Sequence, residues 1–232
     1  TRDRLLTPFA KDTLTDRYLW VGENFQKMFA RVAAVNSDDD PHAQRLYDYI
    51  SRLWFMPSTP ILSNAGHPKN LTISCFLNEM WDSLDEIFET QNENNWLASR
   101  GGGIGTCWSE VRSIGESVGT LDTTGRIGKT SGIIPFCVVQ GTNTLAVSQG
   151  NLRRGSAAMY LDISHPEIVE FLEIRNPHKG DPARKSLHAH HGVVISDAFM
   201  NAVKTNEDWP LVSPATGNVV SVVKARSLWE QI

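Results

Sequence analysis

Three cysteines, Cys75, Cys107 and Cys137, are the side chains most able to do redox or metal chemistry in this chain. They are too few and too scattered for a disulfide framework, and no Cys-x-x-Cys pair is present for a cysteine zinc site. Cys75 lies in the short apolar run 71–77. A single cysteine in such a run is usually a small hydrophobic core residue. The pattern alone therefore favours packing for Cys75, with thiol chemistry as the alternative.

A glycine-flanked loop carries two adjacent cations, Arg153 and Arg154, shortly after Gln149. Two neighbouring guanidinium groups repel each other unless an anionic or planar group lies against them. The loop is therefore either a solvated basic segment or a segment that binds a ligand. The glycine run at 101–105 likewise has two possible interpretations. Residues without side chains allow the backbone to approach closely either a neighbouring strand or a ligand.

Two further patterns fit known motifs poorly. Residues 128–130, which include Lys129, end like a phosphate loop, but the glycine required five residues before Gly128 is a threonine and no apolar strand leads in. His188, His190 and His191 could bind zinc or iron, yet few acids or cysteines nearby could complete a ligand set. A structural role is favoured for these histidines, and no metal site is predicted.

The composition is that of an ordinary globular protein. The 232 residues are 41% hydrophobic and 21% charged, and the net charge is −4, so disorder and a general attraction to nucleic acid or membranes are disfavoured. No run approaches a membrane span, no signal peptide is visible, and the cysteine usage fits a cytoplasmic setting. Because the chain begins with Thr1 and its last predicted helix has only two turns, we expect an excerpt of a longer protein or a processed chain.

The elements that would position these residues divide the chain into a helical region, 1–56, and a region of alternating strands and helices, 57–232. Apolar spacing predicts helices over 12–34 and 43–55, followed by a loop at 57–70. The second region predicts four strands, at 71–77, 104–111, 156–163 and 191–196, and helices at 83–99, 133–145, 166–175 and 197–204. Two short apolar runs, 209–212 and 219–223, flank a turn before a last helix from 225. This alternation predicts a parallel sheet covered by helices, an α/β fold.

Several segments together resemble one enzyme family, the large catalytic subunit of ribonucleotide reductase. The matching segments are residues 55–66, 73–77, 82–84, 101–105, 112, 130–136, 148–155 and 165–168, in the family's order. The resemblance implies a ten-stranded α/β barrel made of two five-stranded parallel halves. This chain would supply the leading helices and the first half-barrel.

The resemblance also implies the chemistry. A radical delivered from elsewhere makes a cysteine thiyl that abstracts the ribose 3′ hydrogen, and two further cysteines reduce the 2′ carbon as water leaves. Cys75 matches the first member of that reducing pair, which suits a thiol because it closes a reducible disulfide. The positions that match substrate-binding residues are Ser58, Thr59, Ser74, Gly102 and Gly103.

A second site implied by the resemblance binds an allosteric dNTP or ATP effector. Its matching residues are Asp82, Ser83, Arg112 and Val118, the last within a first specificity loop at about 113–122. A second loop at 147–156, with Gln149, Arg153 and Arg154, would relay the identity of the effector to the substrate base.

The resemblance implies partners rather than a cofactor bound directly by this chain. The radical would come from a metal-containing small subunit, or alternatively from adenosylcobalamin. The other expected partners are the remaining C-terminal half of the large subunit, a second copy in a homodimer, and a thioredoxin- or glutaredoxin-type reductant; neither membrane nor nucleic acid is expected. The other catalytic cysteines would lie beyond Ile232, Cys107 and Cys137 would be structural, and the chain alone should be inactive.

Two alternatives remain at this stage. The chain could be a non-catalytic nucleotide-binding or assembly module of a split reductase. More remotely, it could be a phosphate-loop hydrolase that depends on Lys129.

Overall fold

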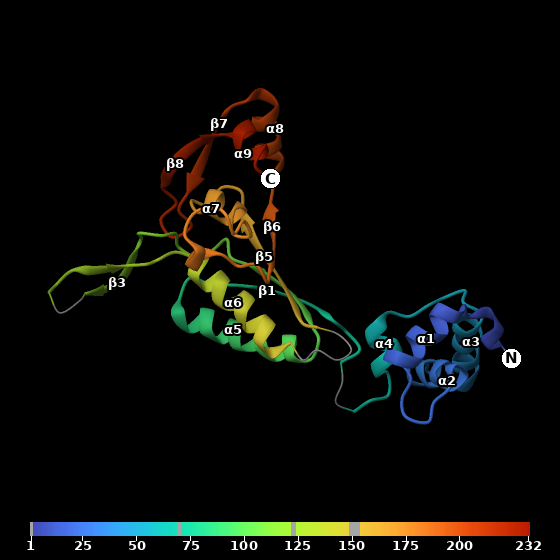
Figure 1. Ribbon diagram of the computed structural model, residues 1–232. Helices are drawn as coiled ribbons and strands as arrows, with labels where there is room; N and C mark the ends of the chain where they lie inside the picture. The colour runs from blue at the N-terminus through green and yellow to red at the C-terminus, as the bar shows by residue number, and fades with distance from the viewer. Residues whose placement is uncertain (1, 69–70, 122–123, 149–153) are drawn as a thin grey trace. The chain divides into compact units, whose positions relative to one another are not determined.

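The computed structural model describes residues 2–68, 71–121, 124–148 and 154–232, which form two compact units, Thr1–Ser74 and Cys75–Ile232 (Figure 1). The first unit is helical and extends to Ser74, well past the boundary at residue 56 expected above. The second unit is an α/β structure that contains all the strands found in the described residues.

The first unit consists of a 3-10 turn η1 (Arg2–Leu5) and helices α1 (Pro8–Arg17), α2 (Phe25–Val35), α3 (Asp40–Ser51) and α4 (Thr59–Asn64). The single helix predicted over 12–34 is wrong, because the chain breaks between α1 and α2. Asn24 starts α2 by accepting a hydrogen bond from the Lys27 N–H at 2.9 Å. The predicted loop over 57–70 contains α4, whose Pro60 occupies the first turn, where proline is tolerated.

The second unit is built on a parallel sheet in the order β1 (Cys75–Glu79), β2 (Gly103–Cys107), β5 (Ser156–Asp162) and β6 (His190–Val194). The register places Cys75 beside Gly103 and Gly103 beside Ser156. The described part of the chain thus provides four parallel strands, whereas a complete half-barrel was expected to have five. The first strand begins at Cys75 and not at 71, so Cys75 is at its start and not near its end.

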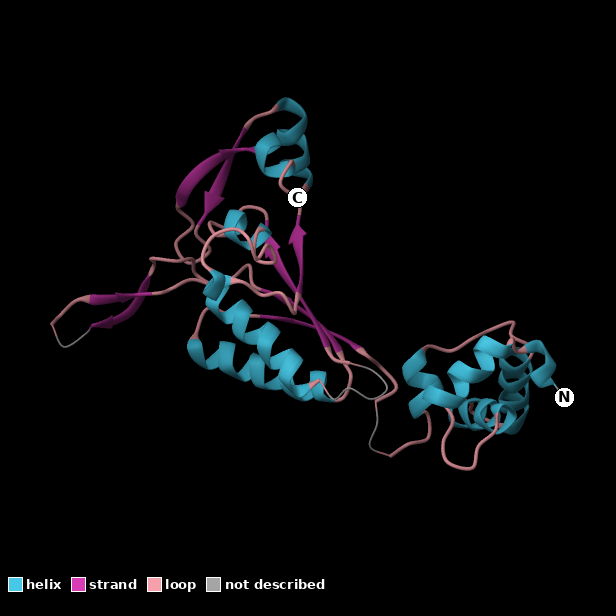
Figure 2. Ribbon diagram, in the orientation of Figure 1, coloured by secondary structure: helices cyan, strands magenta, loops and turns pink. Residues whose placement is uncertain are grey.

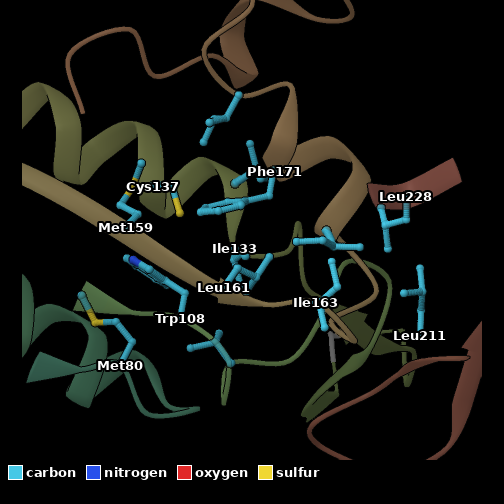
Figure 3. Packing of buried hydrophobic residues seen from close by; sticks show 14 of the residues in the cluster. Met80, Trp108, Ile133, Cys137, Met159, Leu161, Ile163, Phe171, Leu211 and Leu228 are labelled. Atoms are coloured by element: carbon cyan, nitrogen blue, oxygen red, sulfur yellow. The ribbon is translucent and has the colours of Figure 1, made fainter. Parts of the chain in front are cut away.

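One face of this sheet is covered by α5 (Leu84–Ser99), α6 (Ile134–Val147) and α7 (Ile168–Leu172) (Figure 2). Each helix follows a strand and returns the chain to the next parallel strand, as in a singly wound barrel. Beneath the helices lies a core in which Trp108, Met159 and Leu161 are fully buried (Figure 3). The α/β class expected from the sequence is confirmed.

Two β-hairpins flank the sheet. β3 (Ser117–Leu121) and β4 (Ile127–Lys129) pair antiparallel where a plain loop was predicted. β7 (Asp208–Val212) and β8 (Val219–Lys224) form the second hairpin, packed with α8 (Asp197–Thr205) and α9 (Ala225–Trp229). A short 3-10 turn, η2 (Pro182–Arg184), packs on α6. No helix in the described ranges is both long and apolar enough to cross a membrane.

Candidate functional site

Cys75 lies on the face of the sheet that the helices leave open. Side chains alternate along β1, so Phe76 and Asn78 point towards the helices while Cys75 and Leu77 point away. The Cys75 side chain is exposed, and 85% of Leu77 is accessible to solvent. The packing role that the pattern favoured for Cys75 is therefore wrong: the sulfur is at a surface and not among buried aliphatic side chains.

Three glycines of β2 and β6 lie on the open face of the sheet, near Cys75, Leu77 and Tyr160. Gly103 and Gly105 lie on β2 between the outward residues of β1 and β5. A Cβ atom on Gly105 would lie 2.7 Å from Leu77 Cδ2 and 3.3 Å from the Tyr160 ring, and one on Gly192 would lie 2.8 Å from the same ring. The Tyr160 ring and the Leu77 side chain thus cover Gly105 and Gly192, whereas Gly103 is the residue without a side chain that pairs with Cys75.

Gly102, also predicted to line the substrate site, has a packing requirement of its own. A Cβ atom there would lie 2.8 Å from the Leu97 carbonyl oxygen and 3.0 Å from the Phe76 ring, on the side covered by α5. The absence of a side chain at Gly102 is therefore explained by helix–strand contact, while Gly103 faces the open side.

The other predicted substrate-binding residues, Ser58, Thr59 and Ser74, belong to the helical unit. Ser58 and Thr59 are exposed at the start of α4, and the Thr59 hydroxyl lies 3.1 Å from the Tyr18 hydroxyl. Ser58 makes no side-chain cap to α4, so its hydroxyl is not committed to the helix. That these hydroxyls bind a substrate phosphate stays a prediction.

The structure brings together two of the predicted effector residues. Asp82 and Arg112 come from the segments that follow β1 and β2, at the carboxyl ends of the strands, 30 residues apart in sequence. Arg112 Nε donates to Asp82 Oδ1 and Oδ2 at 2.9 and 3.0 Å, and the Arg112 N–H donates to Oδ1 at 3.0 Å. The hydrogen bond to Asp82 raises the pKa of Arg112 further, so this guanidinium stays charged.

The remaining effector residues surround this pair. Ser83 caps α5 by accepting from the Glu86 N–H at 3.2 Å, as the capping pattern predicts. Arg112 also donates to the Ser117 carbonyl of β3, next to the partly exposed Val118. Of the second predicted loop, Arg154 is exposed, while Gln149 and Arg153 lie outside the described residues.

The other two cysteines, the possible metal ligands and Lys129 lie, within the described residues, in geometries unsuited to the motif chemistry considered for them. Cys137 is fully buried and its pKa is raised by burial, whereas Cys107 is half-buried on the open face with Sγ 3.2 Å from the Ser109 hydroxyl. Within the described residues, no group of three or more His, Cys, Asp or Glu side chains could hold a metal ion. Lys129 lies in β4, an antiparallel strand, which differs from the strand–loop–helix geometry of a phosphate loop.

Sequence reasoning missed a buried polar network and the roles of His165 and Glu167. Thr106, on the helix-covered face of β2, is hydrogen-bonded to Asn94 and Gln140. The sequence signal for this network was Thr106 itself, because a threonine within an otherwise buried strand needs hydrogen-bond partners. His165 and Glu167 were noted only as a family segment, although both are buried and hydrogen-bonded to distant backbone.

Comparison with known proteins decides the family. Residues 73–231 match the family described as ribonucleotide reductase, barrel domain, and residues 4–70 match ribonucleotide reductase, all-alpha domain. The chain belongs to the ribonucleotide reductase large-subunit family. The boundary between the two matched domains of the reductase agrees with the division into two compact units at Ser74.

Three relatives illustrate the range of this reductase family. A Frog virus 3 (isolate Goorha) protein, provisionally named a ribonucleoside-diphosphate reductase large subunit, is 38% identical over 228 residues, which cover 98% of this chain and 37% of the relative. The ribonucleoside-diphosphate reductase large subunit of Invertebrate iridescent virus 6 is 34% identical over 240 residues, covering 100% of this chain and 24% of the relative. A vitamin B12-dependent ribonucleoside-diphosphate reductase of Mycobacterium tuberculosis (strain CDC 1551 / Oshkosh) is 32% identical over 247 residues, covering 100% of this chain and 34% of the relative. The chain therefore spans well under half the length of these relatives.

Proposed function

We propose that this chain supplies part of the catalytic and allosteric machinery of a ribonucleoside-diphosphate reductase, with Cys75 as a reducing thiol. The observation that carries the proposal is the exposed Cys75 side chain beside Gly103 on the open sheet face. Because Gly103 has no side chain, a ribose could approach the backbone beside Cys75 closely. In the proposed reaction the 2′ hydroxyl leaves as water, the substrate gains two electrons, and Cys75 with a second cysteine loses them as a disulfide.

The complete reaction needs groups that this chain does not contribute. We propose that the thiyl-forming cysteine and the second reducing cysteine come from the remainder of a complete large subunit, and that a thioredoxin- or glutaredoxin-type protein reduces the disulfide. A metal-containing small subunit is the favoured radical source. Adenosylcobalamin is the second candidate, supported by the 32% identity to a B12-dependent relative.

The Asp82–Arg112 pair is the proposed effector site. Its carboxylate can accept hydrogen bonds from a deoxyribose, and its guanidinium can neutralise phosphate. The exposed Val118 on the adjoining hairpin offers an apolar contact. A dNTP or ATP is the proposed ligand, bound where the segments after β1 and β2 meet.

A second copy of the chain is the proposed partner of α5. Leu84, Phe88 and Trp96 are large apolar side chains of α5 that are each more than half exposed, whereas Ile87, Gln91 and Asn94 of the same helix are buried. Large exposed apolar side chains gathered on one surface helix are typical of a protein interface. Its position next to Ser83 would place the dimer contact beside the effector site.

Cys75→Ser in the complete large subunit tests the catalytic proposal. We expect ribonucleotide reduction to be lost while dNTP binding, measured by calorimetry, is retained, because serine cannot form the disulfide. Cys107→Ser, on the same face, is the matched control and should remain active. Turnover by Cys75→Ser would contradict the proposal, and a wild-type protein that binds dNTPs without turnover would favour a non-catalytic nucleotide-binding module.

A further inference from the structure

The turn between β5 and α7 holds the backbone on both sides of Arg112. His165 Nε2 lies 3.0 Å from the Val111 carbonyl oxygen, and Glu167 Oε2 accepts from the Ile114 N–H at 2.9 Å. The Glu167 N–H donates to His165 Nδ1 at 3.1 Å, so Nε2 carries the proton and donates to Val111. One turn, more than fifty residues away in sequence, thereby fixes residues 111 and 114.

The same Glu167 oxygen also ties the two ends of the β3–β4 hairpin together. It accepts from the Ile133 N–H at 3.1 Å, just after the hairpin, as well as from Ile114 just before it. Gly132 has a φ of +81°, and a Cβ atom there would lie only 2.2 Å from the carboxylate. The carboxylate can occupy this position only because residue 132 has no side chain.

Glu116 adds a second brace at the hairpin base. Its carboxylate accepts from the Ser113 N–H at 2.7 Å and from the Ser213 hydroxyl. The Thr130 N–H donates to the Glu116 carbonyl at 2.9 Å, and the Gly115 N–H donates to the Thr130 carbonyl at 2.9 Å. These hydrogen bonds fix the hairpin base, from which Val118 and the rest of β3 extend.

Neither His165 nor Glu167 is placed to touch a nucleotide. Their exposed fractions are 2% and 3%, and the nearest cation to Glu167, Arg184, lies 3.6 Å from Oε1 and is itself paired with Glu170. Any effect that they have on a ligand must therefore pass through the backbone that they hold.

We propose that the His165-Pro166-Glu167 turn is a positioning clamp that sets the placement of Arg112 and the β3–β4 hairpin for effector binding. The inference rests on the proposed effector site at Asp82 and Arg112. The turn directly follows β5, and β5 begins at the end of the second predicted specificity loop. Through this strand the clamp connects the effector site to the segment proposed to sense the substrate base.

The first test measures the dissociation constants of dTTP, dATP and dGTP for the complete large subunit by calorimetry, with the melting temperature recorded alongside. Glu167→Ala should weaken effector binding about tenfold, within the range by which positioning residues modulate coupled sites. Glu167→Gln should stay within about threefold of wild type, because one amide oxygen can still accept from both Ile114 and Ile133. Rescue by the amide would show that the hydrogen bonds, and not the charge, carry the effect.

The second test uses glycine substitutions matched in backbone strain. Gly132→Ala would drive the carboxylate out of its place and should weaken effector binding as Glu167→Ala does. Gly22→Ala carries the same positive-φ cost, since Gly22 has a φ of +83°, but no atom lies within 4 Å of its added Cβ. Its effector affinity should be unchanged. A core variant in α9, Leu228→Ala, controls for lowered stability and should also bind normally, since Leu228 is 1% exposed.

The outcomes separate the two proposals. If wild type binds dNTPs and Arg112→Ala does not, but Glu167→Ala and Gly132→Ala both bind normally, the clamp is refuted and the effector site stands. If Leu228→Ala weakens binding as much as Glu167→Ala, general destabilisation explains the loss and the clamp is likewise refuted. If wild type binds no dNTP, or Arg112→Ala binds normally, the effector site itself is wrong and the clamp falls with it.

Discussion

Thr106 is the hub of a buried hydrogen-bond network that joins β1, β2, α5 and α6. Its hydroxyl donates to Asn78 Oδ1 at 2.9 Å and accepts from Asn94 Nδ2 at 3.2 Å and Gln140 Nε2 at 2.8 Å. The amide oxygens are also used, because Asn94 accepts from Asn78 and Gln140 accepts from the Trp108 indole. The network holds β1 and β2 against the helices and so supports the strands that carry Cys75 and Gly103.

Thr106→Val removes the hydroxyl and keeps the shape, so its cost can be worked from the partners. Asn94 and Gln140 are each 2% exposed, and their two N–H donors would have no water to replace Thr106. A buried polar group left without a partner costs about 1–3 kcal/mol, so two donors imply about 2–6 kcal/mol. Asn78 is only half-buried, so the loss of its hydrogen bond from Thr106 adds less than the two buried donors do. We expect a loss of about 3 kcal/mol in the free energy of unfolding, a large part of the ~5–15 kcal/mol typical of a folded protein.

Equilibrium urea unfolding of wild type and variant measures this loss, with circular dichroism as the probe. Thr142→Val is the matched control, since Thr142 is on the exposed side of α6 and donates only to the Val138 carbonyl of its own helix. The control should lie within about 0.5 kcal/mol of wild type. A Thr106→Val variant that loses less than about 1 kcal/mol would refute the reasoning, because the two amide donors would then have other partners.

Two further predictions concern stability. Burial raises the pKa of Glu167 above its ordinary 4.5, so its contribution to stability is full below pH 4.5 and is lost as pH rises through the folded pKa. Glu167→Gln removes that loss, and its melting temperature relative to wild type should therefore rise from pH 4.5 to 7; a constant difference would contradict this. Arg31→Ala should cost about 3 kcal/mol by leaving Glu23 buried without its partner, since the two side chains are 12% and 13% exposed. Arg17→Ala, from a pair whose side chains are 61% and 75% exposed, should cost less than about 0.5 kcal/mol in the same urea titration.

The helices and strands that local chemistry specifies were predictable from the sequence. The helix expected at 83–99 is observed as α5, because the Ser83 cap and the residues that follow it act within a few positions of each other. The alternation of strands and helices likewise predicted the parallel sheet. The break between α1 and α2 was missed because Tyr18, four residues after Leu14, continues the helical apolar spacing into it. The β3–β4 hairpin was missed because strands of three to five residues carry too little periodicity to be told from a loop.

The candidate site residues were predicted through the family resemblance. Their exposure and their hydrogen-bond partners could not be predicted from the sequence. Pattern alone placed Cys75 in the core, since an apolar run does not reveal that only one face of the strand is covered. The pairing of Asp82 with Arg112 joins residues 30 positions apart, and no local spacing encodes it.

The sequence by itself thus determined the α/β class, the starts of α5, α6, α8 and α9, and the family, because periodicity, caps and motifs act over short stretches of chain. Only the tertiary structure decided which sheet face stays open, which ions pair, and that His165 and Glu167 hold the backbone around Arg112. Those outcomes depend on segments that meet only after the chain has folded, when buried backbone N–H and carbonyl groups must each find a partner.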